Sequence, residues 1–206
     1  LDFGLKEGET LLVKTSVSAS SAAGVERNLA EVAHWDFDAV RRATEARWEE
    51  LLGAVELSGC DDERRTAFYT ALYHVYLQPV RLSDAGDREF YSAFSIWDTF
   101  RAVHPLYTIL RPETTAPFVN SFLEHYRREG SLPVMPYFGY DSDCMLGKHT
   151  VPVIVDAYLK SLKGLGGLEK VDWGLAYEAV TNALTVTHPQ AEKEDWAVYD
   201  AKGYYP

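Results

Sequence analysis

The sequence predicts a mainly α-helical fold. From residue 60 onward, about six segments place apolar residues three and four positions apart, and no part of this region alternates convincingly as a strand does. Loops rich in glycine, proline and aspartate separate the segments, as expected where paired helices surround a pocket in an (α/α) toroid. Periodicity alone does not distinguish a toroid from a bundle or a solenoid. The absence of a repeat of about 20–50 residues counts against the solenoid.

The first twenty residues follow a different pattern. Val13, Thr15 and Val17 alternate with polar residues, which predicts strand structure within residues 1–20. A single hairpin cannot bury its own apolar face. We therefore expect these strands to belong to a sheet whose other strands lie outside this chain.

The remaining elements are expected to be helices with recognisable ends. Asp36, Asp61 and Asp172 precede periodic segments and are suited to cap them, while Pro79 and Gly130 are suited to end helices. Residues 82–90 are expected to form a solvated turn, and residues 131–149 a loop that carries function. The expected helices are 22–32, 37–53, 61–78, one shaped by Pro105, 115–129, 150–162, 173–186 and 194–202.

Composition excludes several classes of partner. The net charge of -11 argues against nucleic acid and anionic membranes, because both require basic patches. No run of about 18 apolar residues occurs, so no membrane-spanning helix is predicted. The two cysteines, Cys60 and Cys144, are too few for a disulfide framework or a zinc site.

The stretch FSIWDTFRAVHPL, from Phe94 to Leu106, concentrates the chemistry. Asp98 and Arg101 are three residues apart among apolar residues, and on one helical turn they would pair with each other. Trp97 beside them favours a second interpretation, a sugar site. An indole stacks on the C–H face of a sugar ring, while neighbouring charged groups bind its hydroxyls.

This stretch closely resembles the W-D-T-F/Y-R-x-x-H-P-L signature of glycoside hydrolase family 92, the calcium-dependent exo-acting alpha-mannosidases. Other segments are similar to further blocks of the family in the family's order. They are EVAHWDFDAVRRATEARWEELL (31–52), FYTALYH (68–74), CMLGKHTVPVIVDAYLK (144–160) and YDAKGYYP (199–206). The resemblance implies the first half of an (α/α)6 toroid catalytic domain over residues 59–206. It also implies a helical linker at 21–58 and the end of an N-terminal β-sandwich at 1–20.

The resemblance also implies roles for individual residues. Family members resemble inverting glycosidases, in which one carboxylic acid protonates the leaving oxygen and a second carboxylate activates water. The family's acid is the Glu of an Asn-Glu-Thr-x-Cys-Met run. When that run is aligned on Cys144, the Glu falls on Asp141, whose side chain is one methylene group shorter. The general base and most calcium ligands are expected after the block ending at Pro206, outside this chain. Trp97, Asp98, Arg101 and His149 are expected to bind the substrate.

The function implied is an alpha-mannosidase that releases terminal mannose from glycans such as N-glycans, using calcium, in an extracellular or periplasmic location. Its expected partners are the mannose-containing glycan and the remainder of the parent polypeptide. Because a shortened acid can misplace the proton, two alternatives stay open. One is a mannosidase acting on a mannose-phosphate linkage, whose leaving group needs little protonation. The other is a non-catalytic carbohydrate-binding homologue. A purely structural helical domain is a third, more distant possibility.

Overall fold

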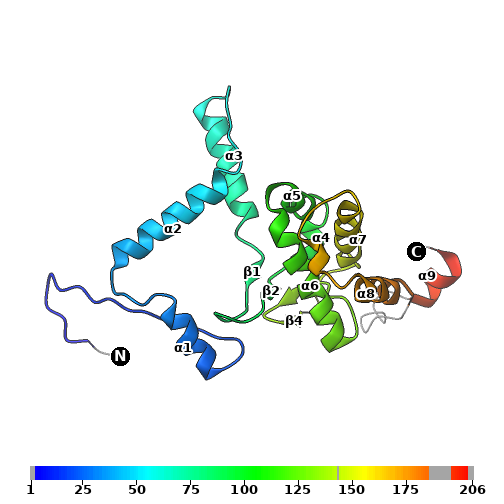
Figure 1. The fold of residues 1–206 in the computed structure, drawn as a ribbon, viewed down its shortest axis with the longest axis horizontal. Helices are drawn as coiled ribbons and strands as arrows, with labels where there is room; N and C mark the ends of the chain where they lie inside the picture. Colours follow the sequence, from blue (N-terminus) through cyan, green and yellow to red (C-terminus); the bar gives the residue numbers. More distant parts are fainter. Residues whose placement is uncertain (1–2, 143, 186–195, 204–206) are drawn as a thin grey trace. The chain divides into compact units, whose positions relative to one another are not determined.

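The computed structural model describes residues 3–142, 144–185 and 196–203 (Figure 1). Parts of the expected strand, the ends of two expected helices and the end of the YDAKGYYP block lie outside the described residues. The chain divides into two compact units, one of residues 1–76 with 83–88 and one of residues 77–82 with 89–206. Helices dominate both, and the expected mainly helical fold is confirmed. In the described part, no helix has the length and apolar character needed to cross a membrane.

In the first unit, the described residues form three helices, each opened by a side chain that accepts a hydrogen bond from the helix backbone. They are α1 (Ala22–Ala30), α2 (Phe37–Leu52) and α3 (Asp62–Val75). Ser21 accepts from the Gly24 N–H, and each of the expected caps Asp36 and Asp61 accepts from the N–H of the third residue of its helix. The capping predictions for α2 and α3 are therefore confirmed.

The expected strand structure at the start of the chain is not formed by residues 3–20. These residues carry no strand assignment, and Val13 and Val17 are exposed. A strand requires a partner whose backbone completes its hydrogen-bond ladder, and none of the described strands pairs with this segment. Alternating sequence alone therefore does not produce a ladder here.

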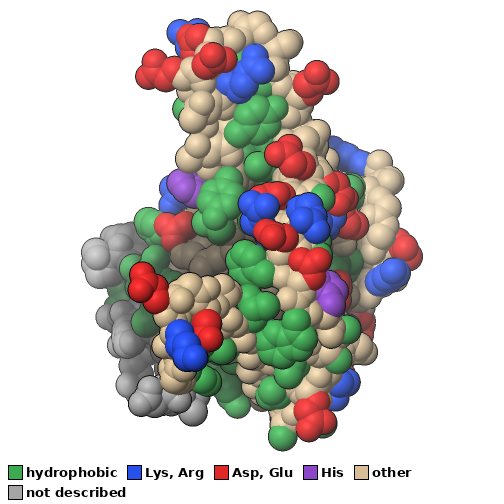
Figure 2. Space-filling model, turned by 90° about the vertical axis from the view of Figure 1, so that its left-hand side faces the viewer, with side chains coloured by type: hydrophobic (Ala, Val, Ile, Leu, Met, Phe, Trp, Pro, Cys, Tyr) green, Lys and Arg blue, Asp and Glu red, His purple; other side chains and the backbone are tan. Residues whose placement is uncertain are grey.

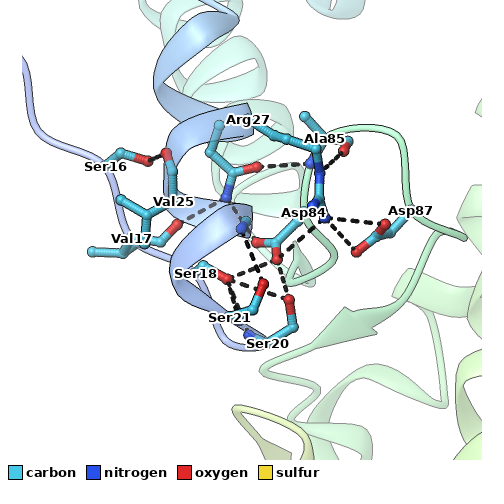
Figure 3. Close-up of polar contacts among 12 residues, drawn as sticks. Ser16, Val17, Ser18, Ser20, Ser21, Val25, Arg27, Asp84, Ala85 and Asp87 are labelled. Carbon is cyan, nitrogen blue, oxygen red and sulfur yellow. Dashed lines mark hydrogen bonds and ion pairs between the residues drawn. The ribbon is translucent and has the colours of Figure 1, made fainter.

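The expected turn at 82–90 is formed and is exposed at residues 86–89, but one of its residues, Asp84, is buried rather than solvated (Figure 3). Its carboxylate accepts hydrogen bonds from Ser18 Oγ at 2.7 Å, from Asn28 Nδ2 at 2.8 Å and from Ser20 Oγ. These bonds, first from Ser20 and then from Ser18 and Asn28, lower the pKa of Asp84 below its ordinary value. A buried charge that is hydrogen-bonded is tolerated, which is why the carboxylate of Asp84 can lie inside this unit.

Arg27 and Gly24, both on α1, complete this cluster, and Figure 3 shows the contacts of Arg27. Arg27 donates to the Ala85 carbonyl at 3.0 Å and forms an ion pair with Asp87 at 3.1 Å. Gly24 on α1 lies directly against Asp84, because a Cβ at this position would be 2.7 Å from Asp84 Cγ. The loop and α1 therefore approach more closely than any residue larger than glycine would permit.

Apolar side chains remain exposed in the first unit. Helix α2 buries none of its residues, and Phe37 and Trp35 are exposed beside a hollow of about 290 Å³. Figure 2, which looks at the side that lies on the left in Figure 1, shows hydrophobic side chains at the surface among acidic and basic ones. Packing of further polypeptide against this chain stays a prediction, and these surfaces are compatible with it.

The second unit is built around a central helix, α6 (Pro112–Glu129). Figure 1 shows α6 within a cluster that includes α5 (Val103–Leu110), α7 (Thr150–Ser161) and α8 (Trp173–Thr185), and α6 contacts all three. Val119, Phe122 and Leu123 of α6 are fully buried. The helix begins at Pro112 rather than near Thr115, because a proline at the first helical position has no N–H to leave unpaired.

Shorter elements complete this unit. They are α4 (Ile96–Thr99), a 3-10 turn (Leu168–Lys170), α9 (Trp196–Lys202) and the strands β1 (Val80–Arg81), β2 (Tyr91–Ser92), β3 (Pro136–Tyr137) and β4 (Tyr140–Asp141). These strands form antiparallel pairs, β1 with β2 and β3 with β4. The sequence predicted no strand after residue 60. Each of these strands has two residues, and so short a strand cannot show the alternation of apolar and polar residues by which strands are predicted.

Candidate functional site

The signature segment places three predicted site residues in and just after α4. Strand β2 leads into this helix, where Trp97 is 38% exposed and Asp98 is exposed. The Ser95 hydroxyl donates to the Asp98 carboxylate. Asp98 and Arg101, both within the described residues, do not form the ion pair that their spacing suggests.

Arg101 instead lies against aromatic rings. Its guanidinium carbon is 5.3 Å from the centre of the Trp97 ring and 5.2 Å from that of Phe100. A guanidinium at this distance from a ring is attracted to its electron-rich face. The interaction holds Arg101 beside Trp97, while the neighbouring Asp98 is exposed.

His149 joins this group from a distant part of the sequence. It precedes α7, and its ring centre is 4.4 Å from that of Phe100. Its Nδ1 is buried and has no hydrogen-bond partner among the described residues. Gly147 contributes to this position, because its φ of +88° suits glycine and a Cβ there would be 2.7 Å from His149 Nδ1. Ring contacts therefore connect Trp97, Arg101, Phe100 and His149.

Asp141 lies on the hairpin formed by β3 and β4. Its two carboxylate oxygens accept hydrogen bonds from the backbone N–H groups of Val134, at 2.6 Å, and Met135, at 3.1 Å. The hairpin is fixed to the segment before the signature, since the Ala93 N–H donates to the Pro136 carbonyl at 3.0 Å. The hairpin that carries Asp141 is thus linked to the segment that leads to Trp97. The Asp141 carboxylate accepts hydrogen bonds from backbone N–H groups.

A family profile described as the Glycosyl hydrolase family 92 catalytic domain matches residues 24–206. The chain belongs to glycosyl hydrolase family 92. The resemblance found from the signature is thereby confirmed.

Solved structures of family 92 enzymes agree with this membership. The family GH92 inverting mannosidase BT2199 from Bacteroides thetaiotaomicron is 29% identical and aligns with a TM-score of 0.81 over 92% of this chain. The alpha-mannosidase BT3965 from the same organism is 33% identical, with a TM-score of 0.74 over 82% of this chain. BT3965 has also been solved in complex with mannoimidazole.

A curated relative is an uncharacterized secreted glycosidase from Arthroderma benhamiae, 28% identical over 170 residues and 80% of this chain. This chain spans 18% of that relative, and 24% and 27% of the BT3965 and BT2199 chains. The similarity therefore concerns a limited part of the family 92 polypeptide.

Among the described residues of this family 92 chain, three that are not glycine have positive φ angles that the sequence did not predict. They are Ala93 (φ 60°), Phe138 (φ 48°) and Met145 (φ 71°). Each lies within four residues of a predicted site residue, namely Trp97, Asp141 and His149. Such strained positions concentrate at functional sites, where the surrounding structure holds them in place. No residue type in the sequence signals them, because all three are unusual choices for this conformation.

The histidine of the family signature has a structural position. His104 is buried and packs against aromatic rings, with Phe94 and Phe118 at centre distances of 6.0 and 6.1 Å. Burial lowers the pKa of His104 to about 4, because the apolar surroundings disfavour the charged imidazolium. His104 is therefore neutral at physiological pH and supports the core beneath the signature.

The family resemblance also implies calcium. Nowhere among residues 3–142, 144–185 and 196–203 do three or more His, Cys, Asp or Glu side chains gather in a way that could hold a metal ion. Calcium prefers six to eight oxygen ligands, including carboxylates. The described residues of this chain therefore do not fit a calcium site.

Proposed function

We propose that the full-length polypeptide containing this chain is an exo-acting, inverting alpha-mannosidase that releases terminal mannose from glycans. Family 92 membership supports a glycoside hydrolase, and the similar enzymes BT3965 and BT2199 are mannosidases. The observation that carries the proposal is the set of ring contacts connecting Trp97, Arg101, Phe100 and His149, with Asp98 exposed beside it. This arrangement combines an aromatic face with hydroxyl-binding groups, as a sugar site requires.

In this proposal, each residue binds the mannose that is cleaved. Trp97 packs on the C–H face of the ring, and the Asp98 carboxylate accepts hydrogen bonds from sugar hydroxyls. Arg101 positions the indole and donates to oxygen atoms, while His149 offers a ring nitrogen. Binding that strengthens as the sugar distorts toward its oxocarbenium-like transition state accelerates cleavage.

Asp141 is proposed as the general acid, and its surroundings define a second candidate function. Both of its oxygens accept from backbone N–H groups, whereas a general acid must carry a proton and present it to the leaving oxygen. This favours a substrate whose leaving group departs with little protonation, such as a mannose-phosphate linkage. A non-catalytic carbohydrate-binding homologue is compatible with the same contacts.

Two finer parts of the proposal rest on relatives alone. An extracellular or periplasmic location follows the relative that is named a secreted glycosidase. Calcium dependence follows the family resemblance, with ligands expected mostly outside this chain.

The experiment compares three substrates with the full-length polypeptide. They are an α-linked mannobiose, α-mannosyl fluoride, and a mannosyl phosphodiester. Cleavage of mannobiose, with β-mannose as the first product by NMR, would support the leading proposal. Cleavage of the phosphodiester and the fluoride without mannobiose would favour the second candidate. Binding of mannose without cleavage of any substrate would identify a carbohydrate-binding homologue.

The variant Asp141→Glu tests the acid role in the same assay. If placement of the acid limits catalysis, this variant should increase activity on mannobiose more than on α-mannosyl fluoride, because fluoride departs with little help. Equal changes on both substrates would remove Asp141 from the acid role.

A further inference from the structure

The tip of the β3–β4 hairpin has an unusual composition for its geometry. Strand pairing matches Tyr137 with Tyr140, so Phe138 and Gly139 form a two-residue connection. Both have positive φ, 48° at Phe138 and 93° at Gly139, as a type I′ turn requires. Turns of this type strongly favour asparagine, aspartate or glycine at the first position. A phenylalanine there is strained, because its Cβ crowds the backbone at positive φ.

The strained residue does not contribute to the core of its unit. The side chain of Phe138 is 70% exposed and that of Tyr140 is 75% exposed. The Phe138 ring contacts the Tyr137 ring at a centre distance of 6.1 Å. No burial by the described residues therefore offsets the backbone strain, and strained residues of this kind are typical of functional sites.

The backbone that carries the exposed rings is nevertheless held in a defined position. The Gly139 N–H donates to Ser92 Oγ at 3.3 Å, and the Ala93 N–H donates to the carbonyl of Pro136, which is itself buried. Both bonds anchor the hairpin to the chain just before the signature segment. A backbone that is ordered in advance presents its aromatic rings to a ligand at a lower entropic cost than a mobile one.

We propose that Phe138, assisted by Tyr140, binds the sugar on the leaving-group side of the bond being cleaved and thereby selects among glycans. This rests on the proposed mannosidase function. The hairpin also carries Asp141, the residue proposed to protonate the leaving oxygen, so the rings beside it belong to the leaving-group side. Aromatic faces suit this role because they stack on the C–H face of a sugar.

The test uses the variants Phe138→Asn and Phe138→Trp in the full-length polypeptide. Asparagine suits the turn but lacks the ring, so the melting temperature should hold or rise while kcat/KM on α-linked mannobiose falls by about tenfold. Activity on α-mannosyl fluoride should be unchanged, because fluoride is too small to reach the hairpin tip. The variant Phe138→Trp retains an aromatic face and should retain activity on mannobiose. Tyr177→Ala, which removes a ring that is 76% exposed on α8, serves as the matched control and should change neither activity.

The outcomes separate this proposal from the function on which it rests. A wild-type protein that cleaves neither substrate would overturn the mannosidase function and this inference with it. Wild-type cleavage of both, with an unchanged ratio in Phe138→Asn, would overturn the leaving-group role alone. A lower melting temperature with equal losses on both substrates would show that Phe138 packs against other polypeptide, which also overturns the proposal.

Discussion

The variant Gly147→Ala tests whether His149 takes part in the site. Gly147 has a φ of +88°, and an added Cβ would overlap His149 Cε1 and lie 2.7 Å from Nδ1. Since the imidazole also packs in an aromatic contact with Phe100 at 4.4 Å, the ring must leave that position. A misplacement of about 1 Å in a site can cost about a hundredfold in rate. We therefore expect kcat/KM to fall by about that factor.

Gly164→Ala supplies the matched control. Gly164 has a φ of +93° and no neighbouring atom within 4 Å of an added Cβ. Both variants carry the strain of an L-residue at positive φ, about 1–2 kcal/mol. Only Gly147→Ala adds an overlap with His149. This overlap is a local overpacking, which lowers the free energy of unfolding by a further amount of about 1–3 kcal/mol. The difference between the two variants thus isolates displacement of the imidazole.

The assay combines thermal unfolding with kcat/KM on α-mannosyl fluoride, using the full-length polypeptide. Adding His149→Ala removes the ring that the new methyl group would meet, so Gly147→Ala should cost less stability in that background than in the wild type. Additive stability effects, or equal activity in Gly147→Ala and Gly164→Ala, would refute the placement of His149 or its role.

Three further predictions address other residues. Asp98→Asn should keep the melting temperature, because this side chain is exposed, yet reduce kcat/KM about a hundredfold or more; near-normal turnover would return Asp98 to a structural role. The pKa of His104 is about 4 in the folded protein and about 6.5 in the unfolded chain, so the folded protein binds fewer protons between these two pH values. Its free energy of unfolding should therefore fall by about 3 kcal/mol as the pH decreases through this window. In the variant His104→Phe, denaturant unfolding at pH 7 and pH 4 should no longer show this decrease in the free energy of unfolding. An unchanged decrease would contradict its attribution to His104. Gly24→Ala should lower the melting temperature, although alanine normally stabilises a helix interior, because its Cβ displaces the Asp84 carboxylate; a higher melting temperature would argue against the cluster.

Helices and helix caps were the features that local sequence patterns predicted best. Helix α2 follows Asp36, α3 follows Asp61, and the Asp172 carboxylate accepts from the Leu175 N–H at the start of α8, all as expected. These features are local, since a cap acts within three residues and an apolar stripe repeats every three or four. The signature around Trp97 is local as well, because it lies in one continuous stretch, and that stretch alone indicates the family.

The candidate site was predictable only in part. The sequence singled out Trp97, Arg101 and His149, but an equally local argument paired Asp98 with Arg101, whereas Arg101 lies against two aromatic rings. The contact between His149 and Phe100 joins two segments that no local pattern connects.

The remaining features depend on contacts between distant segments of the chain. Asp84 reads as a loop residue, yet it is buried because Ser18, Ser20 and Asn28, 56 to 66 residues away, supply its hydrogen bonds. Phe138 occupies a turn position that its own conformational preference disfavours, and hydrogen bonds from the hairpin to residues 92–93 hold that turn in place. Burial, pairing and strain depend on the free energy of contacts between distant segments, and that free energy can exceed the local preferences that spacing and residue type express.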